Sequence, residues 1–217
     1  MKSETQKLAP DKSDTVLLIL DLISDFGFSD AARLFKAALP AAKRIARLKA
    51  RARRAGVPAI YINDNYGRWR SDFGEVMRLC SRSDEHAATL LELIGPDKTD
   101  YCILKPKHSG FFATALDTVL GYIGAQNLVL TGVSANQCVL FTANDAYVRE
   151  YRLWIPRDCI ASATRRETQF ALQYFKTELK ADVRPSARIP LSQMRQQARA
   201  IHTRARNRQH RSRSAGG

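Results

Sequence analysis

The sequence has no long hydrophobic run. Its first residues, "MKSETQKLAPDKSD", mix charges of both signs and lack the apolar stretch of about 7 to 15 residues found in signal peptides. No later apolar run approaches the length that spans a bilayer. We therefore expect a cytoplasmic protein that is neither exported nor inserted into a membrane.

Cysteine and histidine are scarce, with four of each in the chain. The cysteines form no Cys-x-x-Cys pair, no framework of the kind that staples small secreted domains, and no zinc-ligand spacing with the histidines. Two of the histidines, His202 and His210, lie close to the C-terminus. We expect reduced thiols, no metal and no cofactor. The cysteines are Cys80, Cys102, Cys138 and Cys159.

Acidic residues are absent from residues 195–217, which contain seven arginines and so supply half of the net charge of +14. This segment is poor in large apolar side chains, so we expect residues 193–217 to form a disordered tail. A solvated extension is the simpler interpretation, and a nucleic-acid-binding arm is the alternative. Because the tail has no aromatic residue for base stacking, we expect at most a weak electrostatic contact with nucleic acid.

Hydrophobic residues make up 45% of the chain and gather in short continuous runs, as they do in buried parallel strands. A weaker run lies near residues 187–191. The clearest runs are "TVLLILD" (residues 15–21), "VPAIYIN" (57–63), "YCILK" (101–105), "NLVLTG" (127–132) and "YRLWIP" (151–156).

Segments with helical periodicity separate these runs. Residues 40–56 begin with Pro40, which suits a first helical turn, and end with Gly56, which suits a C-terminal cap. Residues 111–125 and 164–179 repeat the pattern. The alternation predicts an α/β fold, a three-layer αβα sandwich with a Rossmann-like, mostly parallel sheet of about six strands. We expect an N-terminal tail (1–13), one domain (14–192) and the C-terminal tail (193–217).

Polar residues end the predicted strands. Asp21 ends the first, Asn63 the second and Lys105 the third, while the fourth leads into the turn that carries Cys138. In a parallel sheet, ligands bind beyond the carboxyl ends of the strands. We therefore expect these four side chains to converge on one edge.

This set is suited to acyl transfer. A thiolate is the nucleophilic form of cysteine, and both a helix N-terminus and the Lys105 cation would favour it at Cys138. Asp21 could accept the thiol proton, donate it to a leaving amine and later activate water. The backbone N–H groups of Ser134 and Cys138 could stabilise the oxyanion.

Each of these residues also has a plain structural interpretation. Cys138 could be an inert packing residue, Asp21 could cap a turn, and Lys105 could be a solvated charge at a strand end. Ser134 is a poor rival nucleophile, because the serine elbow G-x-S-x-G needs glycine where this chain has Asn136.

The chain resembles the isochorismatase-like cysteine hydrolases, which include nicotinamidases, N-carbamoylsarcosine amidases and ureidoacrylate amidohydrolases. Three blocks carry the resemblance: "TVLLILDLISDF", "LKPKHSGFFATALDTVL" and "LVLTGVSANQCVLFTANDAYVREYRLWIPRDCIASAT". It implies a triad in which Asp21 is the general acid and base, Lys105 favours the thiolate and Cys138 is the nucleophile. It also implies a homo-oligomer, a dimer or tetramer, and a cis peptide between Val133 and Ser134 that directs the Ser134 N–H into the oxyanion hole.

Some positions depart from the family pattern. The family often has Arg-Tyr-Ser-Ala-Phe where this chain has Lys-His-Ser-Gly-Phe at residues 107–111, so the substrate mouth is expected to differ. The segment 61–73 lacks the Asp-x-His ligands of metal-binding nicotinamidases, which favours a metal-free enzyme. We expect Phe26, Asn63 and Val133 to contact the substrate. Residues 63–73 are either part of a substrate cover or an ordinary surface loop.

The leading hypothesis is therefore hydrolysis of an amide or ureido C–N bond in a small molecule through a thioester. One alternative is vinyl ether hydrolysis of the isochorismatase type, which uses the aspartate without a cysteine and which Cys138 disfavours. A second is a non-enzymatic binder of nucleic acid or an anionic surface through the basic tail. A third is an inactive protein that retains the fold.

Overall fold

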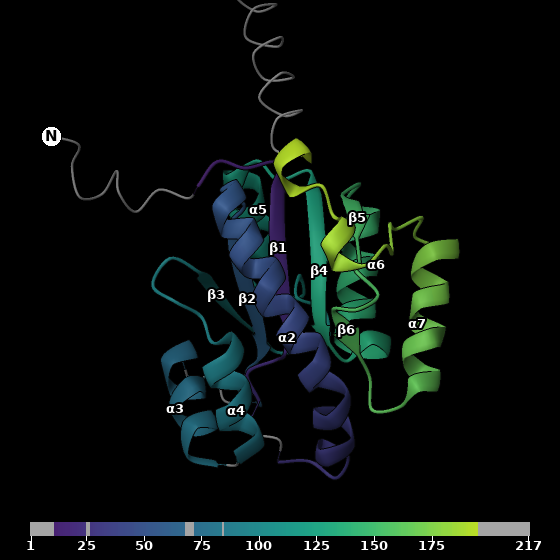
Figure 1. The fold of residues 1–217 in the computed structure, drawn as a ribbon. Helices are drawn as coiled ribbons and strands as arrows, with labels where there is room; N and C mark the ends of the chain where they lie inside the picture. Colours follow the sequence, from purple (N-terminus) through teal and green to yellow (C-terminus); the bar gives the residue numbers. More distant parts are fainter. Residues whose placement is uncertain (1–10, 25–26, 68–71, 84, 195–217) are drawn as a thin grey trace, which may run out of the picture.

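The computed structural model describes residues 11–24, 27–67, 72–83 and 85–194. Within them, one sheet of six strands lies between two layers of helices (Figure 1). Every strand pairing is parallel, and the strand order is β3-β2-β1-β4-β5, with β6 also paired to β4. The strands are β1 (Thr15–Leu20), β2 (Ala59–Asp64), β3 (Tyr101–Lys105), β4 (Asn127–Val133), β5 (Arg152–Trp154) and β6 (Ile160–Ala161).

Two hydrophobic cores lie on the two faces of the sheet, because successive strand residues point to opposite sides. Leu17 and Ile19 of β1 belong to the core under one helical layer, and Val16 and Leu18 belong to the core under the other. The first layer contains α2 (Ala31–Ala55), α3 (Phe73–Ser83) and α4 (Glu85–Ile94). The second contains α5 (Leu116–Ile123), α6 (Leu140–Val148) and α7 (Arg165–Thr177). The predicted three-layer α/β sandwich is confirmed.

The helix predicted from Pro40 to Gly56 begins earlier than expected. It is α2, which starts at Ala31 and contains Pro40 in its interior. Leu34, Ala38 and Ala41 continue the buried face of the helix on both sides of the proline, so packing offsets the backbone hydrogen bond that proline cannot donate. The expected end is correct, since Gly56 caps the helix in the left-handed conformation, with φ of 66°.

The prediction of a weak strand near residues 187–191 is wrong. Residues Ser186–Arg188 form a short 3-10 helix, η2, and the sixth strand of the sheet is β6. Pro185 and Pro190 flank the segment, and neither has a backbone N–H for a strand ladder.

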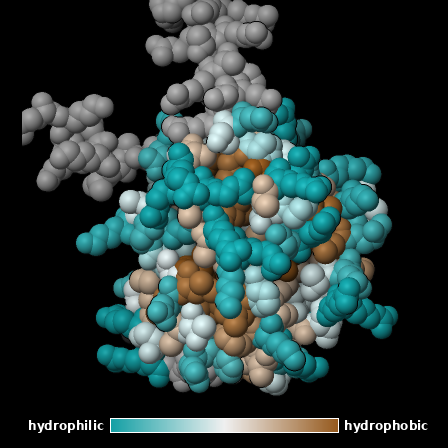
Figure 2. Space-filling view, viewed as in Figure 1, coloured by the Kyte–Doolittle hydropathy of each residue, from teal (hydrophilic) through white to brown (hydrophobic). Residues whose placement is uncertain are grey.

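The outer surface of the α2 layer is largely hydrophilic, with hydrophobic groups showing between the polar side chains (Figure 2). Exposed basic residues of α2, such as Lys43, Arg44 and Arg47, contribute to this surface. None of the helices in the described segments is long and apolar enough to cross a membrane.

Candidate active site

Three side chains meet at the carboxyl edge of the sheet. Asp21 follows β1, Lys105 is the last residue of β3, and Cys138 lies in η1 (Ala135–Val139), a π-helical turn that follows β4. The Nζ atom of Lys105 lies 2.9 Å from Oδ2 of Asp21 and 3.5 Å from Sγ of Cys138. Lys105 therefore stands between an acid and a thiol and contacts both.

The end of β1 determines the direction of the Asp21 side chain. Asp21 adopts a left-handed backbone conformation, with φ of 49°, which aspartate tolerates better than most residues. Its N–H donates to the carbonyl of Ile62, and its Oδ1 accepts the N–H of Asp64 at 2.8 Å. The neighbouring strand β2 thus holds both the backbone and the carboxylate in place.

The turn that carries Cys138 depends on a close approach between β4 and β1. Gly132 has φ of 114°, and a Cβ atom there would lie 2.0 Å from the carbonyl oxygen of Leu20. Only glycine fits this position. The peptide between Val133 and Ser134 is cis. The Ser134 carbonyl accepts the N–H groups of Gln137 and Val139, which closes the turn around Cys138.

A hydrogen-bond pair fixes the same turn from its other side. The Ser162 hydroxyl, just beyond β6, donates to Oδ1 of Asn136 at 2.8 Å. The N–H of Asn136 in turn donates to the Ser162 hydroxyl oxygen at 3.3 Å. The backbone around Cys138 is therefore tied both to β1 and to the segment after β6.

Burial controls the charges of the three groups. It raises the pKa of Asp21, although Lys105, the thiol and the Asp64 N–H all act to lower it. Burial and the negative charge of Asp21 raise the pKa of Cys138, while Lys105 opposes this effect. Burial lowers the pKa of Lys105, but the attraction of Asp21 and Cys138 outweighs it and the net pKa is raised. Lys105 is therefore charged while the resting thiol keeps its proton.

The family model for the isochorismatase domain matches residues 15–187, which include all three of these side chains. The chain belongs to the isochorismatase family. An uncharacterized isochorismatase family protein, YaaI of Bacillus subtilis, is 40% identical over 178 residues, covering 82% of this chain and 97% of that protein. The resemblance noted from the three sequence blocks is thus confirmed.

Two further relatives of this isochorismatase-family chain carry named activities. The ureidoacrylate amidohydrolase RutB of Methylorubrum extorquens is 29% identical, covering 70% of this chain and 71% of that enzyme. The crystal structure of N-carbamoylsarcosine amidase from Thermoplasma acidophilum matches with a TM-score of 0.64 and 26% identity, covering 82% of this chain and 99% of that one. Both relatives are named for cleaving C–N bonds in carbamoyl or ureido compounds.

Two of the three residues expected to contact the substrate, Asn63 and Val133, direct their side chains to the face of the sheet covered by α2. Asn63 is fully buried, and its Nδ2 donates to the Ile23 carbonyl on the face of the sheet covered by α2. The side chain of Val133 packs in the core on that same face. Phe26 lies outside the described residues. Part of the 63–73 segment, residues 68–71, also lies outside them.

The sequence prediction missed two residues that lie close to Lys105 and Cys138. Asp64, adjacent to Asn63, has Oδ2 3.6 Å from Nζ of Lys105. Strand alternation was the available signal, because Asp64 lies on the face of β2 shared with Ile62 and pairs in register with Lys105. His108 is the second, with Nδ1 3.8 Å from Sγ of Cys138. Its only signal was the departure from the family pattern.

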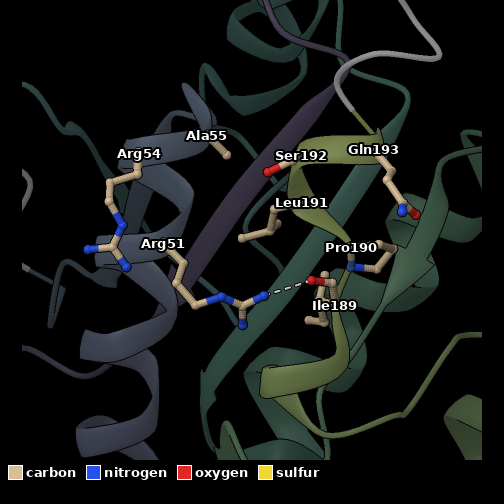
Figure 3. A pocket seen from close by; sticks show the side chains of 8 residues that line it. All are labelled: Arg51, Arg54, Ala55, Ile189, Pro190, Leu191, Ser192 and Gln193. Carbon is tan, nitrogen blue, oxygen red and sulfur yellow. Dashed lines mark hydrogen bonds between the residues drawn. The ribbon is translucent and has the colours of Figure 1, made fainter.

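A separate cavity of about 330 Å³ lies near the carboxyl end of α2 (Figure 3). Because α2 leads directly into β2, this cavity is near the amino edge of the sheet, away from Cys138. Arg51 donates hydrogen bonds to the carbonyls of Ser186 and Ile189 across it, so its guanidinium is engaged by the protein itself. The carboxyl end of α2 lines this cavity, and the partial negative charge of a helix carboxyl end disfavours anions.

Proposed function

We propose that this protein hydrolyses a C–N bond in a small amide or ureido compound through a thioester on Cys138. The observation that supports this most strongly is the position of Lys105, whose Nζ lies within 3.5 Å of both a carboxylate and a thiol. The named activities of the two relatives, a ureidoacrylate amidohydrolase and an N-carbamoylsarcosine amidase, support the same substrate class.

Acylation begins with a proton transfer from Cys138 to Asp21. Because burial raises the pKa of the thiol, the thiolate forms only as sulfur attacks the carbonyl carbon. The transfer moves negative charge from one atom in contact with Lys105 to another, so the same cation stabilises the charge before and after. Lys105 thus lowers the cost of forming the nucleophile without changing its own protonation.

The tetrahedral intermediate carries its charge on the former carbonyl oxygen. In this proposal the backbone N–H groups of Ser134 and Cys138 stabilise that oxyanion, as fixed donors do in acyl transfer. Asp21 then donates its proton to the leaving nitrogen, and ammonia or an amine departs. The thioester that remains is cleaved by water.

The test is mass spectrometry of the protein mixed with a panel of small primary amides, carbamoyl compounds and ureido acids. We expect the protein to convert at least one of them to an acid plus ammonia or an amine, and we expect Cys138→Ala to lose that conversion. Cys102→Ala is the matched control, because Cys102 is an exposed thiol at the opposite end of its strand from Lys105.

A Cys138→Ala variant with parental turnover would contradict the thioester route. We also propose that the protein forms a homo-oligomer, which size-exclusion chromatography with light scattering measures directly.

A further inference from the structure

His108 is a second polar group at the thiol, and it lies on the solvent side. Its Nδ1 is 3.8 Å from Sγ of Cys138, and the residue is exposed. By contrast, the side chain of Lys105 is 0% exposed and that of Asp21 is 15% exposed. Sγ of Cys138 therefore lies 3.5 Å from the buried ammonium group of Lys105 and 3.8 Å from the exposed imidazole of His108.

The position of His108 is fixed by the loop that carries it. The Ser109 hydroxyl donates to Oδ2 of Asp145, and the N–H of Gly110 donates to the Thr142 hydroxyl at 2.9 Å. Both partners are on α6, and both Ser109 and Gly110 are buried. The loop is thus tied to α6 immediately after His108.

The imidazole is also held by an aromatic contact. The rings of His108 and Phe141, a residue of α6, have centroids 5.2 Å apart and an interplanar angle of 43°. Contacts with α6 therefore hold both the loop and the His108 ring, and these contacts keep Nδ1 close to the Cys138 sulfur.

Asp21 is poorly placed for the second half of the reaction. Its Oδ1 accepts the Asp64 N–H, its Oδ2 pairs with Lys105, and only 15% of its side chain is exposed. Once an acyl group is attached to Cys138, hydrolytic water arrives from solvent. A general base must lie within hydrogen-bond reach of that water. Among the described residues, the exposed imidazole of His108 meets this requirement, with its Nδ1 3.8 Å from the sulfur.

We infer that His108 Nδ1, rather than Asp21, is the base that activates water for hydrolysis of the thioester, an inference that rests on the proposed function. Nδ1 accepts a proton as the water oxygen bonds to the carbonyl carbon. The tetrahedral intermediate then collapses, the C–S bond breaks, and the thiolate forms beside Lys105. The imidazolium returns its proton to the sulfur, so water is consumed, the carboxylic acid is released, and thiol and imidazole are regenerated.

The test uses 4-nitrophenyl acetate, which reports acylation by release of 4-nitrophenolate and deacylation by loss of the acetyl group from the protein. In His108→Phe, which keeps an aromatic contact for Phe141 but has no ring nitrogen, we expect the acylation burst to stay within about 3-fold of the parent. Deacetylation should slow by about 100-fold, the size of a typical general-base contribution. Acetyl-Cys138 should accumulate in peptide mapping by mass spectrometry.

Three further variants make the result specific. His108→Asn should show the same accumulation, because an amide cannot act as the base. Lys43→Ala, at an exposed position on the outer surface of α2, should behave as the parent. Cys138→Ala should abolish the burst assigned to Cys138 and report any acetylation of the exposed Cys102.

Equal deacetylation rates in the parent, His108→Phe and His108→Asn would overturn the role of His108. Equal slowing of acylation and deacylation would also overturn it, because that result indicates a structural effect. A raised KM with unchanged kcat would assign His108 to substrate binding instead. Failure of the parent protein to acetylate Cys138 at all would contradict the proposed function itself.

Discussion

The two edges of the sheet each carry a lysine, an aspartate and a cysteine, but the two sets are arranged differently. At the carboxyl edge, Lys105 contacts Asp21 and lies 3.5 Å from Sγ of Cys138. At the amino edge, Lys49 pairs with Asp100, and both influence the pKa of Cys102.

The amino-edge lysine is fully engaged in structural contacts. Its Nζ donates to the Tyr61 hydroxyl at 3.0 Å and to the Gly95 carbonyl at 3.3 Å, and it also pairs with Asp97 and Asp100. Within the described part of the chain, no hydrogen bond joins Lys49 to Cys102. Partial loss of solvent around the thiol, together with the charge of Asp100, raises the pKa of Cys102 to about 11, although the residue as a whole is exposed. The same three residue types thus form a set of structural contacts at the amino edge and, in the proposed function, the reactive group at the carboxyl edge.

Removal of the thiol should give the largest difference in activity between variants at the carboxyl edge and variants at the amino edge. We expect Cys138→Ala to lower kcat/KM by at least about 10³-fold, because removal of a nucleophile leaves only binding and oxyanion stabilisation. Cys102→Ala should leave kcat/KM within about 2-fold. The measurement is steady-state kinetics with the best amide found in the panel, and comparable losses in the two variants would contradict the assignment.

Replacement of the two lysines should affect different properties. Lys105→Met should lower kcat by about 10²-fold or more, the size expected when a fixed electrostatic partner of the reacting groups is removed. Lys49→Met should keep kcat within about 3-fold but lower the free energy of unfolding by about 1 to 3 kcal/mol, because Tyr61 and Asp100 lose a partly buried partner. Kinetics and urea unfolding of both variants check this, and a Lys49 variant that loses activity while remaining folded would break the distinction.

The pH dependence of kcat/KM should report the ionisation of Asp21 at the carboxyl edge, and no group at the amino edge. Only ionised Asp21 accepts the thiol proton, so kcat/KM should rise as pH increases through the Asp21 pKa. Because burial raises that pKa above the ordinary value of 3.8, the midpoint of the acid limb should lie above pH 3.8. A pH profile of kcat/KM in the parent protein measures it. A midpoint at or below pH 3.8 would be inconsistent with a buried base.

The smallest expected effect concerns the second carboxylate beside Lys105. Asp64 lies farther from Nζ than Asp21 does, at 3.6 Å, and its side chain is 37% exposed, so solvent screens its charge. Asp64→Asn should change kcat/KM by about 2- to 5-fold, and Asp97→Asn, at the amino edge, should leave it unaltered. A loss as large as that of Lys105→Met would show that Asp64 takes a direct part in the reaction.

Much of the fold and the relevant edge of the sheet could be predicted from the sequence. Strand ends are readable because buried runs stop at polar residues, and this pattern led to Asp21 and Lys105. The turn after β4 was recognisable because Gly132 and the residues after it belong to the third block of the sequence resemblance.

The rest depended on side-chain direction, which a linear pattern specifies only weakly. The sequence prediction selected Asn63, whereas Asp64 is the residue beside Lys105. A shift of one position along a strand moves the side chain to the opposite face of the sheet. His108 could not be placed near Cys138, because a loop tied to α6 through Ser109 and Gly110 has no periodicity to read. Pro40 was misread because packing can carry a helix through a proline.

The most direct test of the central claim is rapid quenching of turnover followed by peptide mapping of all four cysteines by mass spectrometry. The protein is mixed with the best amide substrate and quenched in acid before one turnover is complete. We predict an acyl group on Cys138, with Cys102 unmodified. Turnover without an acyl group on Cys138, or with one on Cys102 instead, would contradict the account.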